Sequence, residues 1–80
     1  MARGTIRYWA AARAAAGTAE EPYDAATLGS VVEAAAAAHG PDLTHLLAHC
    51  TFLVDGARGR PDTALVDGDV IEVLPPFAGG

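Results

Sequence analysis

Strand-forming residues are concentrated near the two ends of the chain. Residues 5–9 (Thr-Ile-Arg-Tyr-Trp) are rich in β-branched and aromatic side chains, which predicts a first strand. Val70–Leu74 is almost continuously apolar and largely β-branched, which is typical of a central, well-buried strand. Because these two segments are the most apolar of the predicted strands, we expect them to be neighbours at the centre of one sheet.

Between these strands the period of the apolar positions changes to about 3.6 residues, which predicts the main helix of the fold. Thr27 is a candidate N-cap, and Ser30 with Glu33 offers a competing capping box. The dipeptide Gly40-Pro41 ends the segment, because proline cannot continue a helix. The face expected to enter the core consists of Leu28, Val31, Val32, Ala35 and Ala38.

Two shorter segments precede the main helix. Ala10–Ala16 has high helix propensity, and Gly17 can end a short helical turn in the left-handed conformation. Residues 19–24 predict a second strand. Pro22 lies within that strand and cannot donate a hydrogen bond to a neighbour, so the strand should occupy an edge of the sheet.

The segments after the main helix complete the pattern. Residues 43–49 predict a short second helix, and Thr51–Val54 predicts a strand that ends at the turn dipeptide Asp55-Gly56. Residues 57–63 form no clean strand pattern, which leaves one edge of the sheet undefined. The order of elements predicts an α+β fold in the β-grasp arrangement, with the main helix across one face of a mixed sheet of four or five strands.

Length and charge limit the classes of function. Eighty residues form one domain with a thin core and leave no room for a deep, enclosed active site. Ten acidic residues face five arginines and no lysine, and the net charge of −5 disfavours nucleic acids but suits a basic protein partner. The longest alanine run, residues 34–38, is far too short to span a membrane. The single cysteine forms no internal disulfide, which fits a reducing compartment. From these two observations together we expect a soluble, cytoplasmic chain.

The candidate chemistry lies in a C-terminal tail that we expect to leave a domain formed by residues 1–74. This tail consists of Pro75, Pro76, Phe77, Ala78, Gly79 and Gly80. The two prolines stiffen an extended exit, and the nearly side-chain-free end can enter a slot too narrow for a branched residue. The Gly80 carboxylate is ionised at neutral pH and can attack the α-phosphorus of ATP to give an electrophilic adenylate. The alternative is a frayed glycine terminus, against which the stiff diproline argues.

Three motifs resemble the small subunit of molybdopterin synthase, the MoaD family. Residues 8–17 (YWAAARAAAG) resemble its first strand and short helix, and residues 52–56 (FLVDG) resemble its middle strand and turn. Residues 65–70 (LVDGDV) and 75–80 (PPFAGG) resemble its C-terminal signature, which is the most specific part. Thiamine-pathway carriers share the terminal Gly-Gly but are typically shorter and lack the Pro-Pro-aromatic approach.

The resemblance implies a sulfur carrier of the MoaD/ThiS type. An adenylating enzyme of the MoeB type would activate Gly80 with Mg-ATP, and a persulfide donor would convert it to a thiocarboxylate. A large synthase subunit of the MoaE type, within a heterotetramer, would bind the tail and pass the sulfur to a pterin precursor of the molybdenum cofactor. The chain itself would supply sulfur, hold no permanent cofactor and contribute no general acid or base.

Other residues admit competing interpretations. His45 and His49 are one helical turn apart and could share a metal ion, but no third ligand is evident, so no metal site is expected. Cys50 could be a nucleophile beside a histidine, although the start of a strand suits a small buried side chain. Phe77 is either an interface anchor or part of the core.

Two further functions stay open from the sequence. The chain could carry sulfur for another acceptor, such as thiamine, cysteine or a secondary metabolite. It could instead be a non-covalent β-grasp interaction module whose tail is not used. Adding a residue after Gly80 separates this module from the carriers, because only a carrier needs the free carboxylate.

Overall fold

The computed structural model describes residues 1–76, so the predicted site residues Phe77, Ala78, Gly79 and Gly80 lie outside the described part. Within it the elements are β1 (Ala2–Tyr8), α1 (Ala10–Ala16), β2 (Glu20–Ala25), α2 (Leu28–His39), α3 (Pro41–Leu47), β3 (Thr51–Val54), β4 (Ala57–Arg58) and β5 (Val70–Leu74). No helix in this part of the chain is both long and apolar enough to cross a membrane.

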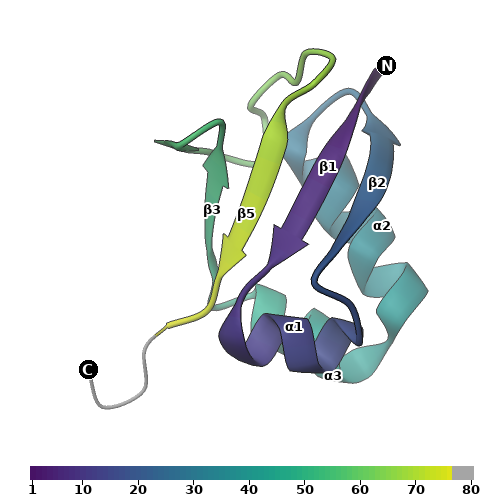
Figure 1. Ribbon diagram of the computed structural model, residues 1–80, viewed down its shortest axis with the longest axis vertical. Helices are drawn as coiled ribbons and strands as arrows, with labels where there is room; N and C mark the ends of the chain where they lie inside the picture. Colours follow the sequence, from purple (N-terminus) through teal and green to yellow (C-terminus); the bar gives the residue numbers. More distant parts are fainter. Residues whose placement is uncertain (77–80) are drawn as a thin grey trace.

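The strands form one mixed sheet in the order β2-β1-β5-β3-β4. The two central strands, β1 and β5, pair in parallel, and the other neighbours pair antiparallel. Figure 1 shows the two central strands side by side, with β2 on one flank and β3 on the other. The predicted mixed sheet, its central pair and the edge position of β2 are therefore confirmed.

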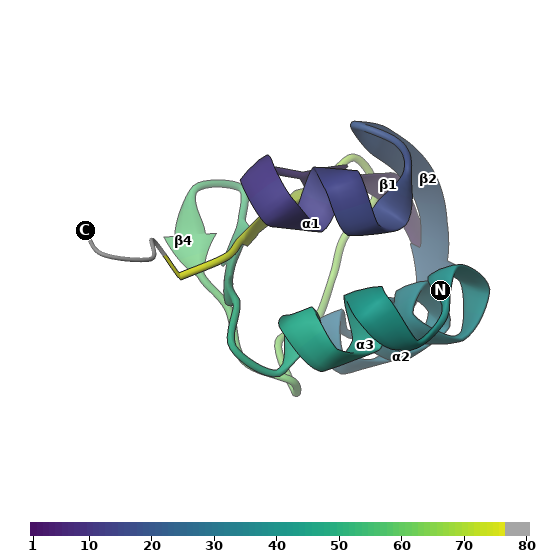
Figure 2. The same ribbon diagram turned by 90° about the horizontal axis from the view of Figure 1, so that it is seen from below.

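The core lies between the sheet and the helices. Helix α2 crosses behind the sheet (Figure 1), while α1 and α3 close the end of the molecule where the C-terminal segment leaves (Figure 2). The largest of the almost fully buried side chains in this core are Tyr8, Ile6, Leu28, Leu43, Ile71, Val31 and Val73. None of the described helices covers the opposite face of the sheet (Figure 1).

Helix α2 begins and ends as its capping residues predict. The Thr27 hydroxyl accepts a hydrogen bond from the Ser30 backbone N–H at 3.3 Å, so Thr27 is the N-cap and the competing capping box does not form. The prediction that Ala38 belongs to the core is wrong, because Ala38 lies on an exposed flank of the helix. Leu28, Val31 and Ala35 are the buried residues of α2.

Several elements differ in extent from the sequence prediction. Strand β1 begins at Ala2, because its pairing with β2 continues as far as Ala25. Helix α3 begins at Pro41 rather than residue 43, since proline suits the first turn of a helix. The undefined segment 57–63 supplies only the two-residue strand β4.

Three polar side chains join β1, β2 and α2 at the margin of the core. The Tyr8 hydroxyl donates to Glu21 Oε2 at 2.6 Å, and His39 Nε2 lies 2.5 Å from the same oxygen. Burial and the neighbouring carboxylate raise the pKa of Tyr8 far above its ordinary value, so its hydroxyl stays protonated and donates. Burial of Glu21 opposes its ionisation, but the bonds from Tyr8 and His39 outweigh that cost and lower its pKa.

This contact predicts a loss of stability in acid. A carboxyl whose pKa is lowered by folding stabilises the native state above its unfolded pKa, and this contribution disappears as the pH falls through the native value. We expect the free energy of unfolding of wild type to exceed that of Glu21→Gln at pH 7. The difference should shrink below the ordinary Glu pKa of 4.5.

Urea unfolding at several pH values between 3 and 7 gives the free energy of unfolding of both proteins, and hence this difference at each pH. Glu33→Gln is the matched control, because it removes an exposed carboxylate from α2. A gap between wild type and Glu21→Gln that stays constant at every pH would contradict the assignment.

Candidate functional site

The C-terminal segment leaves the domain at the end of β5, beside the end of β1. Because the two strands are parallel, Tyr8 near the end of β1 is level with Val73 near the end of β5. Pro75 is still buried against the domain, whereas Pro76 is exposed. Of the two described residues of the predicted tail, only Pro76 is therefore exposed, and the described chain ends in a proline-stiffened exit.

An exposed tryptophan stands next to this exit. Trp9 follows β1, is 46% exposed, and occupies the N-cap position of α1. Its backbone N–H donates to the Val73 carbonyl at 3.2 Å, and its indole Nε1–H donates to Glu72 Oε2 at 3.1 Å. The sequence prediction placed Trp9 inside the first strand and missed this contact. The available signal was a tryptophan at the junction between a strand and an alanine-rich helix.

The open face of the sheet continues from Trp9 and carries apolar side chains. Alternation along β5 puts Val70, Glu72 and Leu74 on the face without helices, and the β3 register adds Leu53 opposite Glu72. Val70, Leu74 and Leu53 are all partly exposed. An exposed aromatic beside partly exposed aliphatic residues is typical of a protein-docking surface.

The described part of the exit brings one carboxylate to the exposed tryptophan. Within residues 1–76, Glu72 is the one titratable side chain hydrogen-bonded to Trp9, and this bond from the indole is its only side-chain hydrogen bond. The arrangement can hold a partner against the sheet beside the exit.

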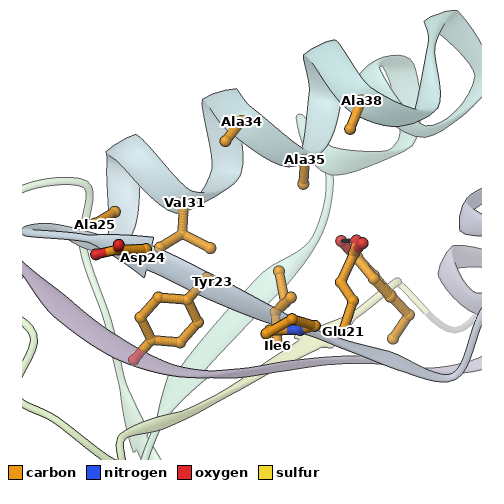
Figure 3. Close-up of a pocket in the computed structure, with 11 residues that line it drawn as sticks. Ile6, Glu21, Tyr23, Asp24, Ala25, Val31, Ala34, Ala35 and Ala38 are labelled. Atoms are coloured by element: carbon orange, nitrogen blue, oxygen red, sulfur yellow. Dashed lines mark hydrogen bonds between the residues drawn. The ribbon is translucent and has the colours of Figure 1, made fainter.

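A shallow groove of about 220 Å³ lies between β2 and α2 (Figure 3). Small side chains of α2 line one wall, and Glu21 and Tyr23 line the other. The polar groups of this wall are already engaged, Glu21 with Tyr8 and His39, and Tyr23 with the Asp69 carbonyl at 2.9 Å. Asp24, which also lines the groove, is paired with Arg3 at 3.5 Å. The groove therefore presents no free pair of groups for acid–base chemistry.

The two surface histidines lie together, but the cysteine beside them points inward. The ring centroids of His45 and His49 are 5.9 Å apart, and the ring planes form an angle of 68°, which is an edge contact. Cys50 is partly buried, and its Sγ donates to the Leu46 carbonyl at 3.3 Å. Residues 1–76 contain no cluster of three or more potential metal ligands. The expectation that the chain carries no metal site stays a prediction.

Comparison with known proteins defines the class of the fold and then the family. Small archaeal modifier protein 1 of Methanosarcina acetivorans superposes with a TM-score of 0.88 at 26% identity, covering 100% of this chain and 98% of that one. The corresponding protein of Haloferax volcanii gives 0.85 at 25% identity over 98% and 99% of the two chains. These matches define a ubiquitin-like β-grasp fold.

A family model described as the ThiS family matches residues 6–80, and the chain belongs to this family of sulfur-carrier-like folds. A putative molybdopterin converting factor subunit 1 from Pyrococcus furiosus gives a TM-score of 0.85 at 25% identity, over 96% of this chain and 100% of that one. A complex of subunits 1 and 2 of molybdopterin-converting factor from Helicobacter pylori shares the fold at 24% identity, with a TM-score of 0.72 over 98% and 99% of the chains. No curated protein matches by sequence.

The environment of Cys50 predicts an unreactive thiol. Burial raises the pKa of this thiol, so less of the nucleophilic thiolate forms at neutral pH. We expect iodoacetamide to alkylate Cys50 in the folded chain more slowly than it alkylates free cysteine at pH 8, and intact-mass spectrometry measures this rate. The chain unfolded in urea is the control and should react as free cysteine does. A folded chain that reacts faster than free cysteine would restore Cys50 as a candidate nucleophile.

Proposed function

We propose that this chain is a sulfur carrier whose C-terminal Gly80 is adenylated and converted to a thiocarboxylate, which donates sulfur to molybdopterin assembly. The observation that carries the proposal is the ThiS family match, which extends through residue 80 and so includes the predicted tail with the domain. The exposed Pro76 at a fixed exit supports it, because a tail must be presented outside the core to enter a partner.

The proposed chemistry needs activation of the carboxylate. A carboxylate is anionic and resonance-stabilised, so it resists attack by an anionic sulfur. Attack of a Gly80 oxygen on the α-phosphorus of ATP releases pyrophosphate and gives an acyl adenylate. The terminal sulfur of a persulfide then attacks the acyl carbon and AMP leaves. A second thiol cleaves the resulting S–S bond, which leaves the thiocarboxylate on Gly80 and a disulfide on the donor.

Two protein partners follow from this proposal. One is an adenylating enzyme of the MoeB type, which binds Mg-ATP, and the other is a large synthase subunit of the MoaE type in a heterotetramer. The complex of subunits 1 and 2 from Helicobacter pylori supports the second partner by analogy of fold. Trp9, which is exposed next to the exit, and the open face of the sheet form the surface that such partners would cover. We place the cycle in the cytoplasm, where ATP is available.

A second candidate function is protein modification. The similarity to two small archaeal modifier proteins favours it, and it would use the same activated Gly80. The chain could be attached through Gly80 to the lysines of other proteins. Because it has no lysine of its own, it could not receive a second copy of itself on a lysine. Thiamine, cysteine or a secondary metabolite as final sulfur acceptor would need the same thiocarboxylate, and transfer assays with each acceptor separate these pathways.

Intact-mass spectrometry tests the central step. With an adenylating enzyme, Mg-ATP and a persulfide donor, the wild-type chain should gain the mass of one sulfur minus one oxygen. Gly79→Val should block this gain without lowering the melting temperature, because the branch would clash only in the partner's slot. One residue added after Gly80 should also block it, for want of the carboxylate. Ala37→Val, on the exposed face of α2, is the control and should be charged normally. An extended, uncleaved chain that still supports cofactor synthesis would refute the proposal.

Phe77 is predicted to anchor the tail in the large subunit. Removal of an aromatic hot-spot residue typically weakens a complex by about 2 kcal/mol or more. Isothermal titration calorimetry with Phe77→Ala measures this loss, and thermal unfolding of the isolated chain should be almost unchanged. The opposite pattern, unchanged affinity with a large loss of stability, would place Phe77 in the core instead.

A further inference from the structure

Glu72 has an unusual position for a charged residue. It lies in the central strand β5, where it is level with Arg7 on one neighbouring strand and Leu53 on the other. Arg7 forms its ion pair with Glu20 at 3.8 Å rather than with Glu72. Within residues 1–76 the Glu72 carboxylate makes a single polar contact, the hydrogen bond from the Trp9 indole.

Trp9 is thereby fixed at two points although almost half of it is exposed. Its backbone N–H is bonded to Val73 and its indole to Glu72, so two adjacent residues of β5 hold both ends of the tryptophan. The next residue, Ala10, has a φ of 48°, in the left-handed region that non-glycine residues rarely occupy. Such backbone strain occurs mostly where the surrounding structure must hold a residue in one place, often at functional sites.

We propose that Glu72 is a positioning residue, which holds the Trp9 indole beside the tail exit as a preset anchor for the adenylating enzyme. This inference rests on the proposed sulfur-carrier function. The surface of this chain indicates what the partner must offer. The partner needs an apolar pocket for the indole and no acidic group facing Glu72. Trp9 adjoins Val73, two residues before Pro75, so an enzyme that takes the tail meets the indole as well.

The expected size of the effect follows from side-chain entropy. A side chain that is free before binding must be ordered in the complex, and a restraint present beforehand removes that cost. Loss of the Glu72 contact should therefore raise KM for the chain about 2- to 10-fold and leave kcat unchanged. The core should not respond, because the contact lies on the open face of the sheet.

The first measurement uses the fact that Trp9 is the only tryptophan in the chain. Time-resolved fluorescence anisotropy and the indole N–H resonance in NMR then report on this one side chain. Glu72→Ala should increase the fast motion of the indole and shift its N–H signal, whereas Glu72→Gln retains an acceptor oxygen and should behave almost as wild type. Asp24→Ala is the matched control: it removes a carboxylate from the same face, where Asp24 pairs with Arg3 at 3.5 Å.

The second measurement is ATP–pyrophosphate exchange by the adenylating enzyme that charges wild-type Gly80. Glu72→Ala should raise KM for the chain as stated, with Glu72→Gln and Asp24→Ala near wild type. Trp9→Ala should raise KM at least as much, and adding Glu72→Ala to it should produce no further increase, since the two act through one contact. Equal melting temperatures of all single variants would show that the fold is preserved.

Two results would overturn the inference while leaving the sulfur-carrier function intact. One is an indole that is as rigid in Glu72→Ala as in wild type. The other is a freed indole with KM equal to that of the Asp24→Ala control, which would show that the enzyme does not use the preset anchor. If the wild-type chain is not adenylated at all, the proposed function fails and the enzyme-facing role of Glu72 fails with it.

Discussion

The parallel pairing of β1 with β5 is the contact on which the rest of the structure depends. Ile6 and Ile71 are level in this pair and almost fully buried, so the two strands join at the centre of the core. A parallel pair needs a long crossover, and every other element lies in that connection. The same geometry brings the end of β5 beside the start of α1. The tail exit and Trp9 are neighbours for this reason.

Much of the fold could be predicted because its signals are local. The Thr27 cap, the Gly17 terminator and the β-branched strand Thr51–Val54 each act within a few residues, and the structure confirms all three. Two of the errors lie where a distant partner decides the outcome. Residues 2–4 join β1 only because β2 is there to pair with them, and Ala38 is exposed because it lines the open groove between α2 and β2.

The candidate site divides in the same way. The chemistry predicted for the tail depends on consecutive residues, so the sequence alone could propose Gly80 as the reactive group. Gly80 lies outside the described residues, so this stays a prediction. The Trp9–Glu72 contact joins residues 63 positions apart. No period or motif in one sequence signals such a pair, because it exists only once β1 and β5 are aligned. A tertiary contact of this kind has to come from the structure.

Two adjacent residues of the chain connect the core to the surface at the exit. Tyr8 turns inward and bonds to Glu21, which also contacts His39, at the end of α2 where alanines offer little apolar surface for packing. Trp9 lies on the outside and bonds to Glu72. The polar cluster supplies a directional contact where hydrophobic burial is weak, and so fixes the end of β1. A fixed strand end is what allows the next residue to present an exposed aromatic in one orientation beside the tail.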